Sequence, residues 1–220
     1  QKLRAKLRAD FLTFYWFLYF DLRANVVQNS YIMKILLTLF VLFFSSSVFA
    51  DDISDFQIEG MSVGDSLLDY LTKNEIEESK SDFYPNSKEY YMKTVYLNSN
   101  LYDYFLMHFK INDDKYIMYT IGGIKNFNNK IEDCYPLKNI IVSDILGLFE
   151  DIKIVDNKKR KHIGDKTGKS YTTDYEIYFK DNSYITISCY DWSDDLDIVD
   201  NLRIAASSKQ IYNFLLNEAF

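Results

Sequence analysis

Five runs rich in tyrosine and β-branched residues most constrain how this chain can fold. These runs cover residues 90–97, 101–111, 115–124, 171–180 and 184–190. Tyr, Ile, Val and Thr favour strands because aromatic and branched side chains pack well on a pleated surface. Short polar segments at residues 112–114 and 181–183 separate two pairs of neighbouring runs. Strands joined by such turns are typical of hairpins, so the sequence predicts an antiparallel sheet.

Three other stretches space their apolar residues as helices do. The first begins at Ser62, the second near Pro136, and the third at the cap-like residues 207–210. We expect a helix end and a loop over residues 72–89, which contain a proline, and a charged loop over residues 156–170.

Short strands are also expected at residues 152–155 and 198–205. Helices interposed between hairpin-linked strands indicate an α+β fold, with antiparallel sheet and packed helices. Each half of the chain, 51–130 and 131–220, is predicted to be a helix followed by a meander. This order fits two repeats of about 75 residues within a single α+β domain.

Residues 33–50 have the build of a secretory signal peptide. Lys34 supplies a short positive segment, residues 35–44 are apolar, and residues 48–50 end in a small residue where cleavage would occur. Ten residues of helix rise about 15 Å, which is too short for a hydrocarbon core of about 30 Å. The alternative is a membrane anchor that is never cut.

The preceding residues, 1–32, carry an aromatic apolar stretch between arginine-bearing flanks. They are interpreted as translated upstream sequence, with Met33 as the true start, because a signal peptide acts from the N-terminus. The alternative is a second membrane helix. In either case the fold is expected to lie in residues 51–220, as one mature domain.

The balance of charge limits the partners. The chain has 25 basic and 32 acidic residues and a net charge of −7, and residues 1–50 hold six basic and two acidic ones, so the remainder carries −11. Such a surface repels nucleic acid and anionic lipid. The expected product is an acidic, soluble protein in the periplasm or outside the cell, without a membrane span after cleavage, without nucleic acid and without a cofactor.

Cys134 and Cys189 are the only cysteines of the chain. Export would place them where disulfides persist. A bridge between them would close a loop of about 55 residues, which would contribute about 4 kcal/mol through chain entropy. The sequence therefore predicts a disulfide between them, with two separate buried thiols as the alternative.

Residues 56–67, which read FQIEGMSVGDSL, resemble the opening of a BamE-like or β-lactamase-inhibitor-protein-like unit. In those families a Gly-Met-Ser/Thr step leads into a short helix and an antiparallel sheet. The resemblance ends at residues 72–75, where a different turn stands. The mature chain is also similar to small uncharacterised exported proteins of low-GC marine bacteria. These resemblances imply an envelope or secreted binding module and bring no catalytic residues.

Lys158, Lys159, Arg160 and Lys161 form the densest basic cluster of the sequence. Such a cluster attracts polyanions, so these residues are a candidate anion-binding site. The alternative is a solvated loop tip.

Asp191, Ser193, Asp195 and Asp197 alternate in an acidic segment, as oxygen ligands do in the first half of a calcium loop. Leu196 stands where such a loop needs glycine, which favours the alternative of an acidic turn.

No catalytic residues are predicted. Residues 164–170 have one residue too few between their glycines for a phosphate loop, and the acidic pairs Asp191 with Asp195 and Glu132 with Asp133 have nothing that fixes their separation.

Tyrosines of the predicted strands are candidates for a binding surface or for ordinary strand packing. They are Tyr102, Tyr104, Tyr116, Tyr119, Tyr175, Tyr178, Tyr184 and Tyr190. The sequence thus favours an exported, non-enzymatic protein that binds another envelope or secreted protein through its sheet. The alternatives are a secreted hydrolase with a carboxylate pair and a purely structural envelope protein.

Overall fold

The structure, a computed structural model, describes residues 52–128, 130–162 and 165–219. The predictions about upstream translation over residues 1–32 and the signal peptide over residues 33–50 lie outside the described residues. No helix in the described part of the chain is both long and apolar enough to cross a membrane.

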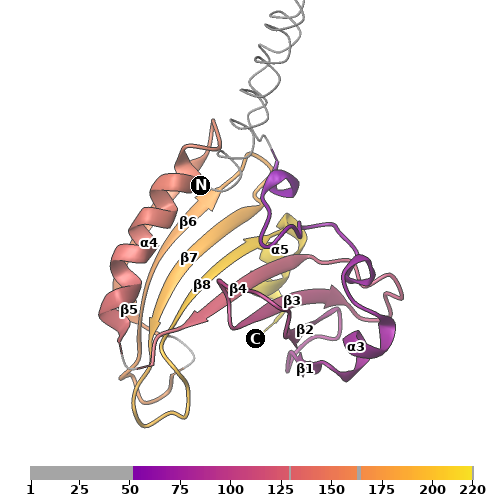
Figure 1. Ribbon diagram of the computed structural model, residues 1–220, viewed down its shortest axis with the longest axis horizontal. Helices are drawn as coiled ribbons and strands as arrows, with labels where there is room; N and C mark the ends of the chain where they lie inside the picture. The colour runs from indigo at the N-terminus through magenta and orange to yellow at the C-terminus, as the bar shows by residue number, and fades with distance from the viewer. Residues whose placement is uncertain (1–51, 129, 163–164, 220) are drawn as a thin grey trace, which may run out of the picture. The chain divides into compact units, whose positions relative to one another are not determined.

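An eight-stranded antiparallel sheet dominates the fold (Figure 1). Its strands lie side by side in the order β1-β2-β3-β4-β8-β7-β6-β5. Their bounds are β1 Lys80–Phe83, β2 Tyr90–Val95, β3 Tyr104–Lys110, β4 Thr120–Asn126, β5 Lys153–Lys161, β6 Tyr171–Tyr178, β7 Tyr184–Asp191 and β8 Asn201–Ser207. The antiparallel sheet is therefore confirmed.

Two four-stranded meanders make up this sheet. Strands β1 to β4 follow one another, β5 to β8 do the same, and β4 pairs with β8 where the meanders meet. The α-helices of the described residues are α3 Lys73–Glu78, α4 Ile131–Leu146 and α5 Lys209–Asn217. The protein is thus mostly β, rather than a balanced α+β fold, because two of these helices have fewer than ten residues.

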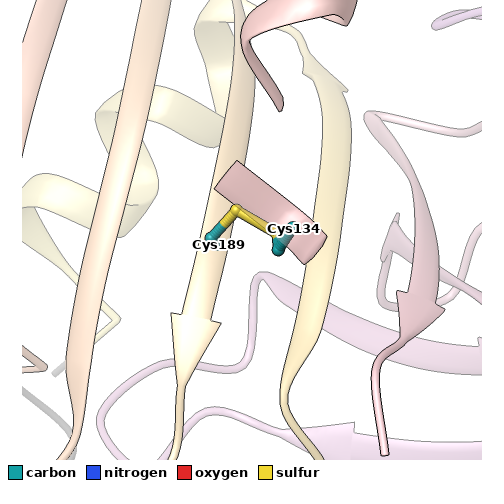
Figure 2. The surroundings of a disulfide bond; sticks show 2 residues. All are labelled: Cys134 and Cys189. Atoms are coloured by element: carbon teal, nitrogen blue, oxygen red, sulfur yellow. A yellow bond between two sulfur atoms is a disulfide. The ribbon is translucent and has the colours of Figure 1, made fainter. Parts of the chain in front are cut away.

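Helix α4 covers one face of the sheet, where it packs against β7 and β8 (Figure 1). Cys134 in its second turn forms a disulfide with Cys189 on β7 (Figure 2). Both cysteines are fully buried, and the bridge joins residues 55 positions apart. The predicted disulfide is confirmed. We call this covered side of the sheet the α4 face.

The N-terminal segment continues the core on the α4 face. Short 3-10 helices at Ile53–Asp55 and Leu67–Asp69 bury Ile53 and Leu67 in the same apolar cluster as Phe105 of β3 and Ile187 of β7. Side chains alternate along a strand, so the residues between these core positions point to the opposite side of the sheet.

The first predicted helix is wrong in its position. Residues 62–71 contain only a 3-10 turn, and the α-helix α3 starts after Thr72. Thr72 and Glu75 form a capping box, in which the Glu75 carboxylate accepts a hydrogen bond from the Thr72 backbone N–H at 2.8 Å. This reciprocal pattern defines a helix start more strongly than Ser62 and Asp65 do. Strand β1 then occupies part of the expected loop.

The charged loop expected from residue 156 is also wrong over its first part, because β5 extends through Lys161. β5 lies at the edge of the sheet and pairs with β6, with an irregularity between Asn157 and Arg160. Lysines on an edge strand discourage pairing with other chains, so a basic sequence is compatible with a strand at this place.

Helix α5 lies against the side of the sheet opposite α4. Phe214 of α5 packs on Tyr90 and Tyr84, with ring centroids 4.9 and 5.0 Å apart. Tyr90 alternates along β2 with Tyr91, which contacts the core of the α4 face. The Ser208 side chain caps α5, within the cap that was predicted over residues 207–210, and the helix covers one end of this second face.

Candidate functional site

A cavity of about 650 Å³ lies on the sheet side opposite α4. Strands β2 to β8 contribute alternate residues to it, and Leu215 of α5 lines it as well. We call this side the cavity face. Residues that matter below are Leu106 and His108 of β3, Arg160 of β5, Thr172, Asp174 and Glu176 of β6, Thr186, Ser188 and Tyr190 of β7, and Arg203 and Ala205 of β8.

Arg203 is the positive centre of the cavity face. It lies on β8, one of the two central strands of the sheet, and its guanidinium is 4.7 Å from the centre of the Tyr190 ring. Its Nε is buried without a hydrogen-bond partner, and no carboxylate of the described residues forms an ion pair with it. A half-buried charge without a counter-ion is costly, because water solvates it poorly there.

The other arginine of the cavity is already neutralised. Arg160 donates to the Asp174 carboxylate at 2.7 Å, and the Asn157 amide donates to the same carboxylate at 2.7 Å. Asp174 is buried, so this pair satisfies a carboxylate that would otherwise be unstable. Nearby, Glu176 accepts a hydrogen bond from the Tyr178 hydroxyl at 2.7 Å.

His108 is buried and uncharged at neutral pH. Burial, together with the charge of Arg203, lowers the pKa of His108 to about 4. Its Nε2 lies 2.5 Å from the Tyr84 hydroxyl, whereas its Nδ1 is buried without a hydrogen-bond partner. Burial lowers the pKa of His162 as well, and the positive charge of Arg203 contributes to this shift. The field of Arg203 therefore reaches both sides of the cavity.

An aromatic cluster borders the cavity at the end of β7. Tyr190 and Trp192 stack with ring centroids 5.7 Å apart and planes 10° apart. The His162 ring lies 4.5 Å from Trp192 and 5.6 Å from Tyr190. These flat side chains hold Tyr190 in place, and Tyr190 in turn carries the Arg203 guanidinium on its face.

The predicted anion-binding cluster is split by the fold. Lys158 pairs with Asp156, and Lys159 pairs with Asp191 at 2.8 Å. Arg160 is the member of the cluster that lines the cavity, where it binds Asp174. Lys161 ends the strand in an exposed position. The structure therefore does not bring the four side chains together, and anion binding by them stays a prediction.

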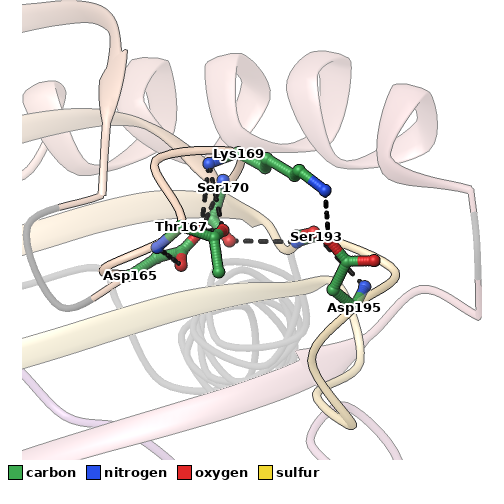
Figure 3. A network of polar contacts seen from close by, with 6 residues as sticks. All are labelled: Asp165, Thr167, Lys169, Ser170, Ser193 and Asp195. Atoms are coloured by element: carbon green, nitrogen blue, oxygen red, sulfur yellow. Dashed lines mark hydrogen bonds and ion pairs between the residues drawn. The ribbon is translucent and has the colours of Figure 1, made fainter.

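The residues proposed for calcium lie among cations instead of facing one another. Asp191 pairs with Lys159, and Asp195 pairs with Lys169 (Figure 3). Ser193 donates its backbone N–H to the Ser170 hydroxyl, and Asp197 is exposed. Within the three described ranges, no group of three His, Cys, Asp or Glu side chains could hold a metal ion. Calcium binding stays a prediction without support from this geometry.

Backbone amides of the turn over residues 165–170 bind the carboxylate of Asp165, which belongs to the same turn. Backbone N–H groups of Thr167, Lys169 and Ser170 donate to Asp165 at 2.8, 3.2 and 2.8 Å (Figure 3). Hydrogen bonds from Ser170 and Thr167 hold the pKa of Asp165 well below its usual range. The backbone amides that a phosphate loop would offer to a ligand are therefore occupied by Asp165. This agrees with the sequence, in which residues 164–170 are one residue too short for a phosphate loop.

The strand tyrosines divide between the two faces. Tyr184 and Tyr190 line the cavity, whereas Tyr102, Tyr116 and Tyr175 pack against the core of the α4 face. Tyr104 pairs with Ile124 and Tyr178 with Tyr184 across neighbouring strands, while Tyr119 contacts Tyr90. Part of the tyrosine content is thus ordinary packing, and part belongs to the cavity.

Sequence reasoning missed the residues that dominate the cavity, namely His108, Asp174, Glu176 and Arg203. One signal was present: Arg203 is one of two arginines in the described residues, and it interrupts an apolar run that was predicted as a strand. A charged residue in such a run indicates the face of the strand that points away from the core.

Comparisons of the chain with known protein families, curated proteins and solved structures find no match.

Proposed function

We propose that this chain is an exported, non-enzymatic binding protein whose cavity face receives a ligand. The cavity of about 650 Å³ carries this proposal, because ligand pockets are typically concave spaces of about 300–1,000 Å³. Polar side chains of β6, β7 and β8, such as Asp174, Ser188 and Arg203, line it beside apolar ones, whereas a purely structural sheet would bury apolar side chains there. Several of these groups, including Asp174 and Ser188, are shielded from bulk solvent, which strengthens polar contacts made inside.

Two features support export to the periplasm or the cell exterior. The disulfide between Cys134 and Cys189 persists in oxidising compartments and is rare in the cytosol. The apolar segment over residues 35–44 has the length of a signal-peptide core.

A hydrolase with a carboxylate pair is supported less well. Asp191 and Asp195 each face a lysine, and they belong to different ion pairs. Asp174 and Glu176 do lie on one face of β6, but Arg160 binds Asp174 directly. A carboxylate held by a guanidinium is a poor general acid, because the ion pair favours its charged form.

The experiment fills the cavity with a large side chain and compares the molecules that the wild-type protein and the variants retain. Thr186 is half-buried and lines the cavity, so Thr186→Trp should occupy its centre. Ile140→Trp is the matched control, since Ile140 is 60% exposed on α4. After incubation with an envelope extract, molecules bound to each protein are identified by mass spectrometry.

We expect one compound to be retained by the wild-type protein and by Ile140→Trp, and to be lost from Thr186→Trp. Retention of the same compounds by all three proteins would contradict binding at the cavity face.

A further inference from the structure

We propose that the cavity binds a small organic molecule through a single carboxylate, which the Arg203 guanidinium receives. This inference rests on the proposed function and names the chemistry of its ligand. It starts from the charges of the lining. Of the two cavity arginines, Arg160 is bound to Asp174, whereas Arg203 has no acidic partner in the described part of the chain.

Arg203 is held in place without being neutralised. Its guanidinium lies on Tyr190, and Tyr190 is stacked against Trp192, so an aromatic support fixes the position of the charge. The side chain directly across from Arg203 on β7 is Ser188, and the next cavity residue along β8 is Ala205. Neither can balance a positive charge. Guanidinium groups bind carboxylates through two parallel hydrogen bonds, which makes an arginine of this kind suited to such a ligand.

Other buried groups of the lining also lack partners. His108 Nδ1 and Thr172 Oγ1 are buried without hydrogen bonds, as is Arg203 Nε. Most buried polar atoms in folded proteins are paired, so three exceptions around one cavity are unusual. The lining thus keeps polar groups that internal contacts do not satisfy.

The balance of charge favours one carboxylate over a phosphate. Glu176 faces the same cavity, where its carboxylate accepts a hydrogen bond from the Tyr178 hydroxyl. A dianion would be repelled by Glu176 and would find a single unpaired cation. A monoanion matches Arg203, while the hydroxyls of Thr186 and Ser188 can bind the neutral polar part of the same molecule.

The test compares acids with their neutral amides in calorimetric titrations of the full chain. The probes are glucuronate with glucuronamide, benzoate with benzamide, and inorganic phosphate, each used at up to about 10 mM so that even a millimolar site fills. We expect at least one carboxylate to bind, with its amide and phosphate binding at least about tenfold more weakly.

Arg203→Gln removes the charge, and Lys115→Gln is its matched control. Lys115 is an exposed cation on the connection between β3 and β4 and does not line the cavity. We expect Arg203→Gln to weaken carboxylate binding about 10- to 100-fold and Lys115→Gln to leave it unchanged. Because the charge is unpaired, the unfolding temperature of Arg203→Gln without ligand should equal or exceed that of the wild type.

Glu176→Gln provides a second test that does not depend on Arg203→Gln folding. It removes the negative charge that competes with the ligand, so carboxylate binding should tighten. The inference is overturned if no carboxylate binds, if acids and amides bind equally, or if binding survives Arg203→Gln. If the extract experiment still identifies a compound that Thr186→Trp loses, the proposed function stands and only its ligand chemistry is wrong.

Discussion

The two faces of the sheet differ in the side chains that they bury. On the α4 face, Ile185, Ile187 and Cys189 of β7 are buried among apolar residues, under a helix that is tied down by a disulfide. On the cavity face, Thr186 and Ser188 of the same strand line the cavity with Arg203, which forms no ion pair within the part of the chain that the structure describes. The comparison indicates that one face supplies most of the stability and that the other tolerates unfavourable groups which are useful for binding.

Removing the disulfide should give the largest effect on the α4 face. The double variant Cys134→Ala/Cys189→Ala releases a loop of 55 residues in the unfolded chain. We expect it to lose about 4 kcal/mol of unfolding free energy in urea titrations under oxidising conditions. Wild-type protein treated with reductant serves as the control and should match the variant. Equal stability of variant and oxidised wild type would show that α4 does not need its covalent tie.

Two neighbouring residues of β7 compare the faces directly. Ile187→Ala leaves a hole in the core of the α4 face and should cost about 3 kcal/mol. Thr186→Ala shortens a half-buried side chain in the cavity and should cost less than about 1 kcal/mol. Both values come from urea unfolding at the same pH. Similar losses for the two variants would remove the distinction between the faces.

The pH dependence of stability should report on the cavity face through His108. Its pKa is about 4 in the folded protein and 6.5 ordinarily. Between pH 4 and pH 6.5, the unfolded chain therefore binds a proton that the folded protein does not bind. Stability from neutral His108 is therefore present above pH 6.5 and is lost as the pH falls towards 4. The loss should be about 3 kcal/mol by pH 4, measured by urea unfolding at several pH values.

The variant His108→Gln supplies the control for this pH effect. It should flatten the dependence between pH 6.5 and 4, leaving the smaller contribution of His162, whose pKa is also lowered. An unchanged pH dependence in this variant would mean that His108 is not the group that titrates.

The sequence predicted the parts of the fold that depend on neighbouring residues. Hairpins such as β6 with β7 follow from alternating patterns and a polar turn, and the cap at Ser208 follows from its own residue type. The disulfide was predictable because only two cysteines exist. Helix α3 was not predicted, although Thr72 and Glu75 form a capping box, because the polar residues 72–89 were expected to be a helix end and a loop.

The cavity could not be predicted because it depends on pairing between distant strands. Arg203 faces Ser188 only because β8 pairs with β7 in one register, and a shift by one residue would turn Arg203 into the core. The neutralisation of Arg160 likewise depends on the pairing of β5 with β6, which brings the Asp174 carboxylate within 2.7 Å of the Arg160 guanidinium. Neither relation is visible in local sequence.

The most direct measurement is the unfolding free energy of Arg203→Met without ligand. Methionine keeps the apolar stem on Tyr190 and removes a charge that has no counter-ion among the described residues. If the cavity face holds Arg203 for binding, the variant should be as stable as the wild type or more stable by up to about 1 kcal/mol. A loss of more than about 1 kcal/mol would show that Arg203 serves the fold, and would contradict the division between a stabilising face and a binding face.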